Sequence, residues 1–325
     1  RRRRPWTVSA AASSAAAAVM DSAGGTPGSE AFAIKGPVFD LLTPFTNDDE
    51  VDLAAFREYL QFLSKAGVRT ILCNGEMAEF ASLTTGEREL LVEFAREAFP
   101  GTVLNHVSAS ALPDVARLIS HSSSSKADGD SGSSRTVADA VVVMPPRSSF
   151  GGLAGERGTE AFLRKALEGC RLPVFLYSAA GNPISPALYA RLCADFPAVS
   201  GILDGSGDGG TFSRLKEASW PGRQLLVVTD EQTGGAGTAG AGNNPSENEA
   251  KDNDNNNNNN SDNNNNGDKN RNAFLALKSG ADACVTGVSN PLPELAVGMQ
   301  ACFDRGDARG ASRAQEELDV WADKR

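Results

Sequence analysis

The feature that most constrains the fold is a repeated pair, in which a short and almost uninterrupted apolar run is followed by an amphipathic helix pattern. The apolar runs cover residues 36–45, 68–75, 102–109, 138–146, 172–179, 199–204, 223–230 and 281–288, and the helix patterns 51–67, 84–99, 113–120, 159–170, 185–196, 211–219, 272–280 and 291–306. Such runs are typical of parallel strands that are buried on both faces. Eight units in 325 residues predict a closed (β/α)8 TIM barrel. A doubly wound open sheet is the alternative, but no G-x-G-x-x-G or Walker pattern follows the first strand.

Three segments do not fit this pattern, and we expect all three to be disordered. Residues 1–33 are rich in Arg, Ser and Ala and resemble an organelle transit peptide, which would direct the protein to a mitochondrion or plastid. If they form only a leader, the protein would be cytoplasmic. Residues 121–136 are Ser/Gly-rich, and residues 234–270 are Gly-rich and then mostly Asn, so neither insert can bury enough apolar surface to offset its ordering entropy. The barrel is therefore expected over 34–308, followed by a single helix over 309–325.

Composition excludes several classes of function. The formal net charge of -10 argues against a nucleic-acid partner, which requires a basic surface. No window approaches the roughly 20 apolar residues that span a membrane. The five cysteines are scattered without a C-x-x-C pair, and the chain has only two histidines, so we expect neither a zinc site nor a disulfide scaffold. No motif calls for a cofactor, and we expect none.

In a barrel of this kind the active site lies at the carboxyl ends of the strands. The residues at those ends are Asp40, Thr43, Asn74, Glu76, Met77, Glu79, Asn105, His106, Pro145, Arg147, Tyr177, Ser178, Leu203, Asp204, Thr229, Asp230, Glu231 and Thr286. Several of them have a structural alternative to a role in chemistry. Asp204 stands before a glycine, where aspartate is more often a turn residue. Tyr177 can belong to the core with its hydroxyl tied to a neighbour, and His106 can be a satisfied structural histidine.

Read in order, the motifs of this chain resemble the dihydrodipicolinate synthase / N-acetylneuraminate lyase family over residues 34–310. The motifs are GPVFDLLTPF at the first strand, NGEMAEFASLTTGER after the second, VVVMPPRSSF at the fourth, LPVFLYSAAGN at the fifth, VSGILDGSGD at the sixth and SGADACVTGVSNPLPEL at the eighth. The resemblance implies a lyase or aldolase in which a lysine on the sixth strand forms a Schiff base with pyruvate or another 2-oxo acid. It also implies a tyrosine on the fifth strand that relays protons, here Tyr177, and a T-T-G-E loop that holds the substrate carboxylate.

The chain departs from the family pattern at the residues that carry this chemistry. Leu203 stands at the lysine position, Glu76 and Met77 replace the two threonines of the loop, and Ala78 replaces its glycine. The substrate-binding positions by resemblance are Thr43, Glu76, Met77, Glu79, Arg147, Asn182, Asp204 and Val285. Family members are commonly homotetramers with a longer helical tail, so the extension over 309–325 looks truncated beside theirs.

Three hypotheses follow from the sequence. The first is a family lyase acting on pyruvate or another 2-oxo acid, which needs a lysine other than residue 203. The second, which we favour over the third, is a barrel that has lost imine chemistry and binds a small molecule, a second copy or an active homologue. The third is a metal-dependent aldol or enolisation step, in which rim carboxylates hold Mg²⁺ or Mn²⁺. Its candidates are Asp40, Glu76, Glu79, Asp204, Asp230 and Glu231.

Overall fold

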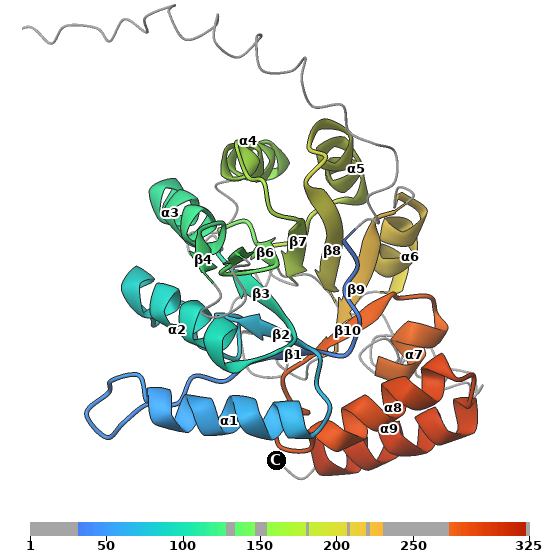
Figure 1. Cartoon of the computed structure of the whole chain (residues 1–325). Helices are drawn as coiled ribbons and strands as arrows, with labels where there is room; N and C mark the ends of the chain where they lie inside the picture. The colour runs from blue at the N-terminus through green and yellow to red at the C-terminus, as the bar shows by residue number, and fades with distance from the viewer. Residues whose placement is uncertain are drawn as a thin grey trace, which may run out of the picture. The chain divides into compact units, whose positions relative to one another are not determined.

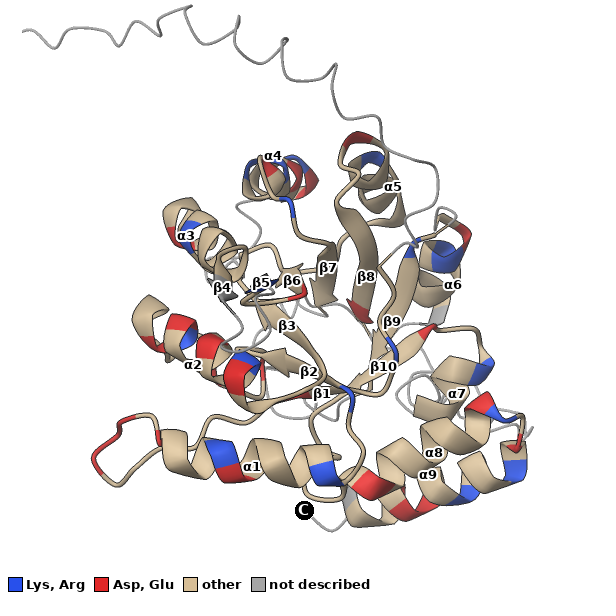
Figure 2. Cartoon of the chain, viewed as in Figure 1, with Lys and Arg blue, Asp and Glu red and all other residues tan. Residues whose placement is uncertain are grey.

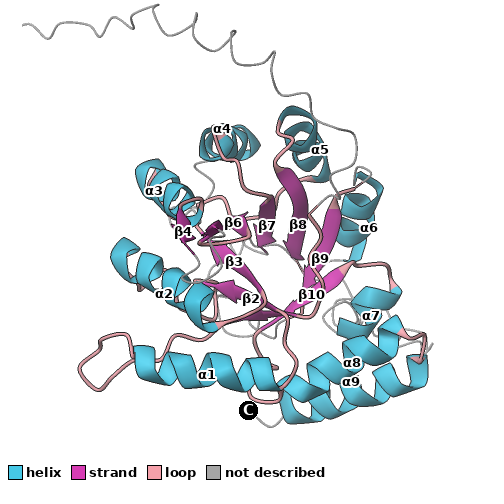
Figure 3. Ribbon diagram, viewed as in Figure 1, coloured by secondary structure: helices cyan, strands magenta, loops and turns pink. Residues whose placement is uncertain are grey.

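From Ala33 onward, the described residues form a closed barrel of eight parallel strands surrounded by helices (Figures 1 and 3). The computed structural model describes residues 32–127, 134–146, 155–179, 182–206, 209–218, 222–229 and 273–322. The strands follow the order β1-β10-β9-β8-β7-β6-β3-β2 around the barrel. Their bounds are β1 Val38–Asp40, β2 Thr70–Cys73, β3 Thr102–His106, β6 Ala140–Val143, β7 Val174–Ala179, β8 Val199–Gly205, β9 Gln224–Val228 and β10 Ala283–Thr286. The closed barrel confirms the predicted fold and excludes the open sheet.

One helix follows each barrel strand, and a ninth helix completes the described chain. The bounds are α1 Leu53–Lys65, α2 Thr85–Ala98, α3 Leu112–Ser122, α4 Gly155–Leu167, α5 Pro186–Asp195, α6 Gly209–Ala218, α7 Ala273–Lys278, α8 Pro293–Asp304 and α9 Ala308–Ala322. The signals that start these helices are local. The side chain of Asp52 accepts hydrogen bonds from the first turn of α1, and Thr84 and Glu87 form a capping box on α2. The extension predicted after the barrel is therefore present as α9.

Side chains alternate between the inside of the barrel and the layer below the helices. On β7 and β8, Leu176 and Ile202 pack in the hydrophobic cluster that the strands share with the helices. Because successive side chains of a strand point to opposite faces, Tyr177 and Leu203 point into the barrel. The two residues are also paired in register across β7 and β8.

The segment before β1 crosses the amino-terminal end of the barrel (Figure 1). The amide N–H of Ile34 donates to Oε1 of Gln224 on β9 at 2.6 Å, and Nε2 of Gln224 donates back to the Ile34 carbonyl at 3.0 Å. The hydroxyl of Thr70 donates to the Lys35 carbonyl at 2.7 Å. These bonds fix the segment to strands on either side of β1 before it enters that strand.

The expected disorder of the insert over 121–136 is wrong for most of its length. Helix α3 continues to Ser122, and two short strands, β4 Ser125–Ala127 and β5 Ser134–Thr136, pair as an antiparallel hairpin. The Ser122 hydroxyl is buried and donates to the Leu118 carbonyl, and Val137 N donates to the Ser124 carbonyl. Paired backbone groups thus hold a segment whose composition offers little apolar surface. Residues 128–133, the leader up to residue 31 and the insert over 234–270 lie outside the described residues.

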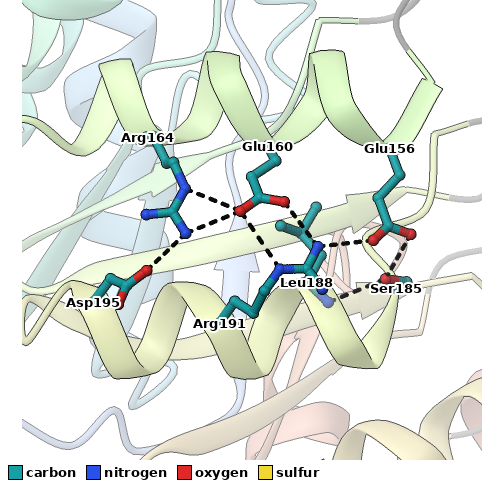
Figure 4. A network of polar contacts seen from close by, with 7 residues as sticks. All are labelled: Glu156, Glu160, Arg164, Ser185, Leu188, Arg191 and Asp195. Carbon is teal, nitrogen blue, oxygen red and sulfur yellow. Dashed lines mark hydrogen bonds and ion pairs between the residues drawn. The ribbon is translucent and has the colours of Figure 1, made fainter.

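Ion pairs connect the outer faces of α4 and α5 (Figure 4). Arg191 on α5 contacts Glu156 and Glu160 on α4, each at 2.8 Å, and Arg164 on α4 contacts Asp195 on α5 at 2.7 Å. The hydrogen bonds from Arg191 hold the pKa values of both glutamates below their usual range. All these side chains are at least partly exposed, so we expect the network to orient the two helices rather than to dominate stability.

Charged residues lie mainly on the helices and loops, whereas the barrel strands carry few of them (Figure 2). No helix in the described part of the chain is both long and apolar enough to cross a membrane.

Candidate active site

The first feature of the site is a hydrogen bond that spans the carboxyl end of the barrel. The Tyr177 hydroxyl on β7 donates to Oε2 of Glu76, in the loop after β2, at 2.8 Å. Strands β3 and β6 separate β2 from β7, so this bond connects elements that are not neighbours in the barrel. Tyr177 and Glu76, both predicted site residues, are therefore in direct contact. A carboxylate beside a phenol can accept and return its proton.

The loop that carries Glu76 is also fixed to the end of β1. The amide N–H of Met77 donates to Oδ2 of Asp40 at 3.2 Å, and the Thr43 hydroxyl donates to the Ala78 carbonyl at 3.0 Å. Glu79, the last predicted residue of this loop, adopts a left-handed conformation with φ 55° and is exposed. The structure thus brings the predicted residues of the first two strands together and leaves the Glu79 side chain at the rim.

Leu203 lies inside the barrel beside Tyr177. Its side chain is only 1% exposed, and it is in register with Tyr177 on one side and with Leu226 of β9 on the other. Apolar interior residues flank it, as expected for a strand of the barrel core. An isobutyl group at this position offers packing contacts but no nucleophile.

The strand that carries Leu203 ends in a turn. Oδ1 of Asp204 accepts a hydrogen bond from Ser206 N at 3.1 Å, which is the two-residue pattern of an Asx turn. The next residue, Gly205, lies under the ring of Tyr177, and a Cβ there would come within 2.8 Å of the ring Cε2 atom. The structural alternative for Asp204 is therefore supported, and glycine at 205 leaves room for the tyrosine that reaches Glu76.

His106 is a fully buried and fully hydrogen-bonded histidine below this site. Its Nδ1 lies 2.9 Å from the Asn74 carbonyl and its Nε2 lies 2.8 Å from the Ser108 hydroxyl. A carbonyl can only accept, so Nδ1 carries the proton and Nε2 accepts from Ser108. The Ser108 hydroxyl in turn accepts from Met144 N at 2.7 Å. These contacts support the interpretation of His106 as a structural histidine whose ring nitrogens are both hydrogen-bonded.

The environment of His106 keeps its ring neutral. Burial, reinforced by the nearby Arg88 cation, lowers the pKa of His106 to about 3. An unfolded chain binds this proton near pH 6.5, so protonation favours unfolding as the pH falls below that value, and the stabilisation by the neutral ring is lost toward pH 3.

We expect the His106 ring to remain the neutral Nδ1–H tautomer from pH 8 to about pH 5, because burial opposes its protonation. Long-range ¹H–¹⁵N spectra of the imidazole nitrogens check this, and the chain has only two histidines to assign. A midpoint near the ordinary value of about 6.5 for His106 would contradict the buried environment.

A buried arginine and two asparagines hold the backbone around His106 by hydrogen bonds. The sequence did not point to the arginine. Arg88 on α2 is 4% exposed, and its guanidinium donates to the carbonyls of Ser108 at 2.8 Å and His106 at 2.5 Å. Burial lowers its pKa to about 10, which still leaves it charged at neutral pH. Asn74 Nδ2 donates to the Arg88 carbonyl and to Asn105 Oδ1. A buried arginine on a helix face gives no sequence signal that distinguishes it from an exposed one.

The remaining predicted residues either make contacts away from Tyr177 and Glu76 or lie outside the described part of the chain. Asn182 donates from Nδ2 to the carbonyls of Pro145 and Pro146 at 3.3 and 3.0 Å, so it connects the loops after β6 and β7. Val285 is buried on β10, and its carbonyl accepts from both N and Oγ1 of Thr229. Neither contact involves the pair formed by Tyr177 and Glu76. Arg147, Asp230 and Glu231 lie outside the described residues.

The carboxylates at the carboxyl end do not gather in the part of the chain that the structure describes. Within those ranges, no three His, Cys, Asp or Glu side chains come close enough together to hold a metal ion. Asp40 and Asp204 are buried, Glu76 is engaged by Tyr177, and Glu79 is exposed. The described carboxylates therefore give the metal-dependent hypothesis no support.

Comparison with known proteins places this arrangement in a family. The model of the dihydrodipicolinate synthetase family matches residues 33–244, which is more than half of the chain. An uncharacterised DapA-like lyase of Thermococcus onnurineus is 31% identical over 174 residues, which cover 53% of this chain and 55% of that protein. The matched region thus spans about half the length of such curated relatives.

Solved structures agree with the fold. A dihydrodipicolinate synthase from Aquifex aeolicus superposes with a TM-score of 0.66 at 18% identity, over 89% of this chain and 81% of its own. A 2-keto 3-deoxygluconate aldolase from Picrophilus torridus gives the same TM-score at 18% identity, over 88% of this chain and 85% of its own. The family match, together with a closed barrel whose carboxyl end carries Tyr177, shows that this chain belongs to the dihydrodipicolinate synthetase family of lyase and aldolase barrels.

Proposed function

We propose that this protein binds a small 2-oxo acid or a related metabolite at the carboxyl end of its barrel without forming a Schiff base. The observation that carries the proposal is Leu203, which is buried in the barrel interior beside Tyr177 and which, by resemblance of the strand motif, stands at the position of the family lysine. Imine formation requires an unprotonated amine, which a leucine side chain lacks.

The positions of the lysines support the same conclusion. None of the eight barrel strands contains a lysine in the described ranges. Lys35 precedes β1 at the amino-terminal end, and Lys65, Lys165, Lys216 and Lys278 lie on helices. The Lys216 ammonium donates to the Ser279 carbonyl at 2.9 Å, between two outer helices. A lysine that took over the role of the family's Schiff-base lysine would have to reach the carboxyl end from elsewhere in the chain.

Glu76 changes the charge that a ligand meets. By resemblance, the loop after β2 holds the carboxylate of the 2-oxo acid, and here that loop presents a carboxylate of its own next to Tyr177. Two like charges a few ångströms apart repel, and at an effective dielectric constant of about 20 the energy at 4 Å is about 4 kcal/mol. A free 2-oxo acid should therefore bind weakly, and an uncharged relative should bind better. Association with a second copy or an active homologue is compatible with this role, and native mass spectrometry would detect it.

We expect Glu76→Gln to strengthen the binding of pyruvate by at least about tenfold, because it removes the repulsion while retaining an oxygen that accepts from Tyr177. Isothermal titration of the full chain measures the two dissociation constants. Methyl pyruvate, which has no carboxylate, should bind both proteins equally.

The matched control is Glu79→Gln, because Glu79 lies in the same loop with an exposed side chain. It removes the same charge and should change pyruvate binding by less than about twofold, since water and salt screen exposed charges. An equal gain from both substitutions would mean that Glu76 is not at the ligand. Failure of the unmodified protein and of Glu76→Gln to bind either compound would refute the proposed site.

A further inference from the structure

A basic pocket lies at the amino-terminal end of the barrel, opposite the candidate active site. It has a volume of about 540 Å³ and is lined by Lys35, Arg69 and Arg135 together with Ser64, Thr70 and Thr102, among others. Thr70 and Thr102 begin β2 and β3 and are paired in register, while Lys35 precedes β1. The pocket therefore opens where three neighbouring strands start.

The charge of this pocket is opposite to that of the whole chain. Its described lining contains three cationic side chains and no carboxylate, although the chain has a formal net charge of -10. Arg135 is partly engaged, because its Nη2 donates to the Gly101 carbonyl at 3.2 Å and lies 3.5 Å from Asp139. Asp139 is itself held by Arg96 at 2.6 Å and by Val103 N at 2.8 Å.

Lys35 and Arg69 are the uncompensated cations of the pocket. Neither side chain has an ion pair or a hydrogen bond within the described ranges, and both are exposed toward solvent. Hydroxyl groups of Ser64 and Thr102 lie in the same lining and can donate to an oxyanion. Guanidinium and ammonium groups around a concave surface are the usual means of holding phosphate.

We propose that this pocket binds a small molecule through a phosphate group. A phosphate dianion would neutralise the charge that Lys35 and Arg69 leave uncompensated, and Arg135 would supply a third donor. The site is separate from the carboxyl end, so its ligand is distinct from the one that meets Tyr177 and Glu76. The inference does not depend on whether the barrel retains any chemistry.

The competing explanation is that the cations only offset the carboxyl end of helix α1. Ser64 and Gly67, which line the pocket, belong to that helix end, where cations are favourable without any ligand. The two explanations differ in what phosphate does. Under the competing explanation, removing the charges of Lys35 and Arg69 lowers the stability of the fold and leaves the affinity for phosphate unchanged.

The test is a calorimetric titration of the full chain with inorganic phosphate at neutral pH and constant ionic strength. We expect one phosphate site in the unmodified protein and a loss of affinity of at least about tenfold in the double variant Lys35→Gln/Arg69→Gln. The control is Lys278→Gln/Arg309→Gln, which removes the same two kinds of charge from exposed positions outside the pocket. It should change the affinity by less than about twofold, because its charges are screened.

Several outcomes would overturn the proposal. The first is no phosphate binding by the unmodified protein at millimolar concentration. The second is an equal loss of affinity in the two double variants, and the third is a melting temperature lowered in Lys35→Gln/Arg69→Gln with its phosphate affinity unchanged. Succinate serves as the carboxylate probe at the same ionic strength. Tighter binding of succinate than of phosphate would assign the pocket to dicarboxylates and would likewise reject a phosphate ligand.

Discussion

Replacing Arg88 by alanine is expected to lower the free energy of unfolding by about 3 kcal/mol. Its guanidinium donates to the carbonyls of Ser108 and His106, and both groups are buried. Alanine leaves these acceptors without a donor and opens a cavity beside Phe80, over which the Arg88 guanidinium lies at 5.3 Å. The loss is smaller than the sum of these effects, because removing the cation also ends the desolvation that lowers its pKa to about 10.

Chemical denaturation of the variant measures the change. Arg88→Lys keeps the charge but loses the planar fork, so it should fall between alanine and the unmodified protein. Arg309→Ala removes an exposed arginine and should change stability by less than about 0.5 kcal/mol. If Arg88→Ala lowered the free energy of unfolding as little as Arg309→Ala, the stabilising role given to the buried hydrogen bonds of Arg88 would be wrong.

Introducing lysine at position 203 is expected to create an imine-forming protein. Leu203→Lys would place an amine in register with Tyr177, and the surrounding apolar side chains would lower the pKa of that amine and favour its neutral, nucleophilic form. Treatment with pyruvate and borohydride should then give a stable adduct, seen by intact mass and located by peptide mapping. Burial of the amine should also lower the free energy of unfolding of Leu203→Lys by roughly 3 kcal/mol relative to the unmodified protein.

A second pair of variants keeps this prediction testable if the lysine protein folds poorly. Leu203→Met is similar in volume and should be almost as stable as the unmodified protein, with no adduct. Leu203→Cys should be alkylated by bromopyruvate faster than the three buried natural cysteines, because binding at the 2-oxo acid site would hold the reagent beside position 203. Absence of both the adduct in folded Leu203→Lys and the alkylation at Leu203→Cys would show that a 2-oxo acid does not reach this position.

The barrel could be predicted from the sequence because its signal is repeated and strong. Eight apolar runs alternate with eight amphipathic patterns, and each becomes a strand or a helix within a few residues of the expected bounds. The first strand is shorter than its apolar run, since regular pairing stops at Asp40 while the chain turns toward Thr43. The hairpin of β4 and β5 escaped prediction because its serine-rich strands depend on backbone pairing, which composition does not reveal.

The candidate site could be predicted only in part. Strand ends and motifs identified Tyr177, Glu76 and Leu203, because parallel strands bring their carboxyl ends together. The sequence did not indicate that Glu76 reaches across two intervening strands to Tyr177, nor that Arg88 supports His106 from α2. Such contacts depend on side-chain directions and loop geometry, which a linear pattern does not specify.

The most direct test of the central claim is borohydride trapping of the unmodified protein. The full chain is incubated with pyruvate, reduced, and weighed intact beside Leu203→Lys as the positive control. Because Leu203 is buried beside Tyr177 and, by resemblance, stands at the position of the family lysine, we predict that the mass stays unchanged while the control gains one carboxyethyl group from the reduced imine. A stoichiometric adduct on the unmodified protein, mapped to any lysine, would contradict the proposed loss of Schiff-base chemistry.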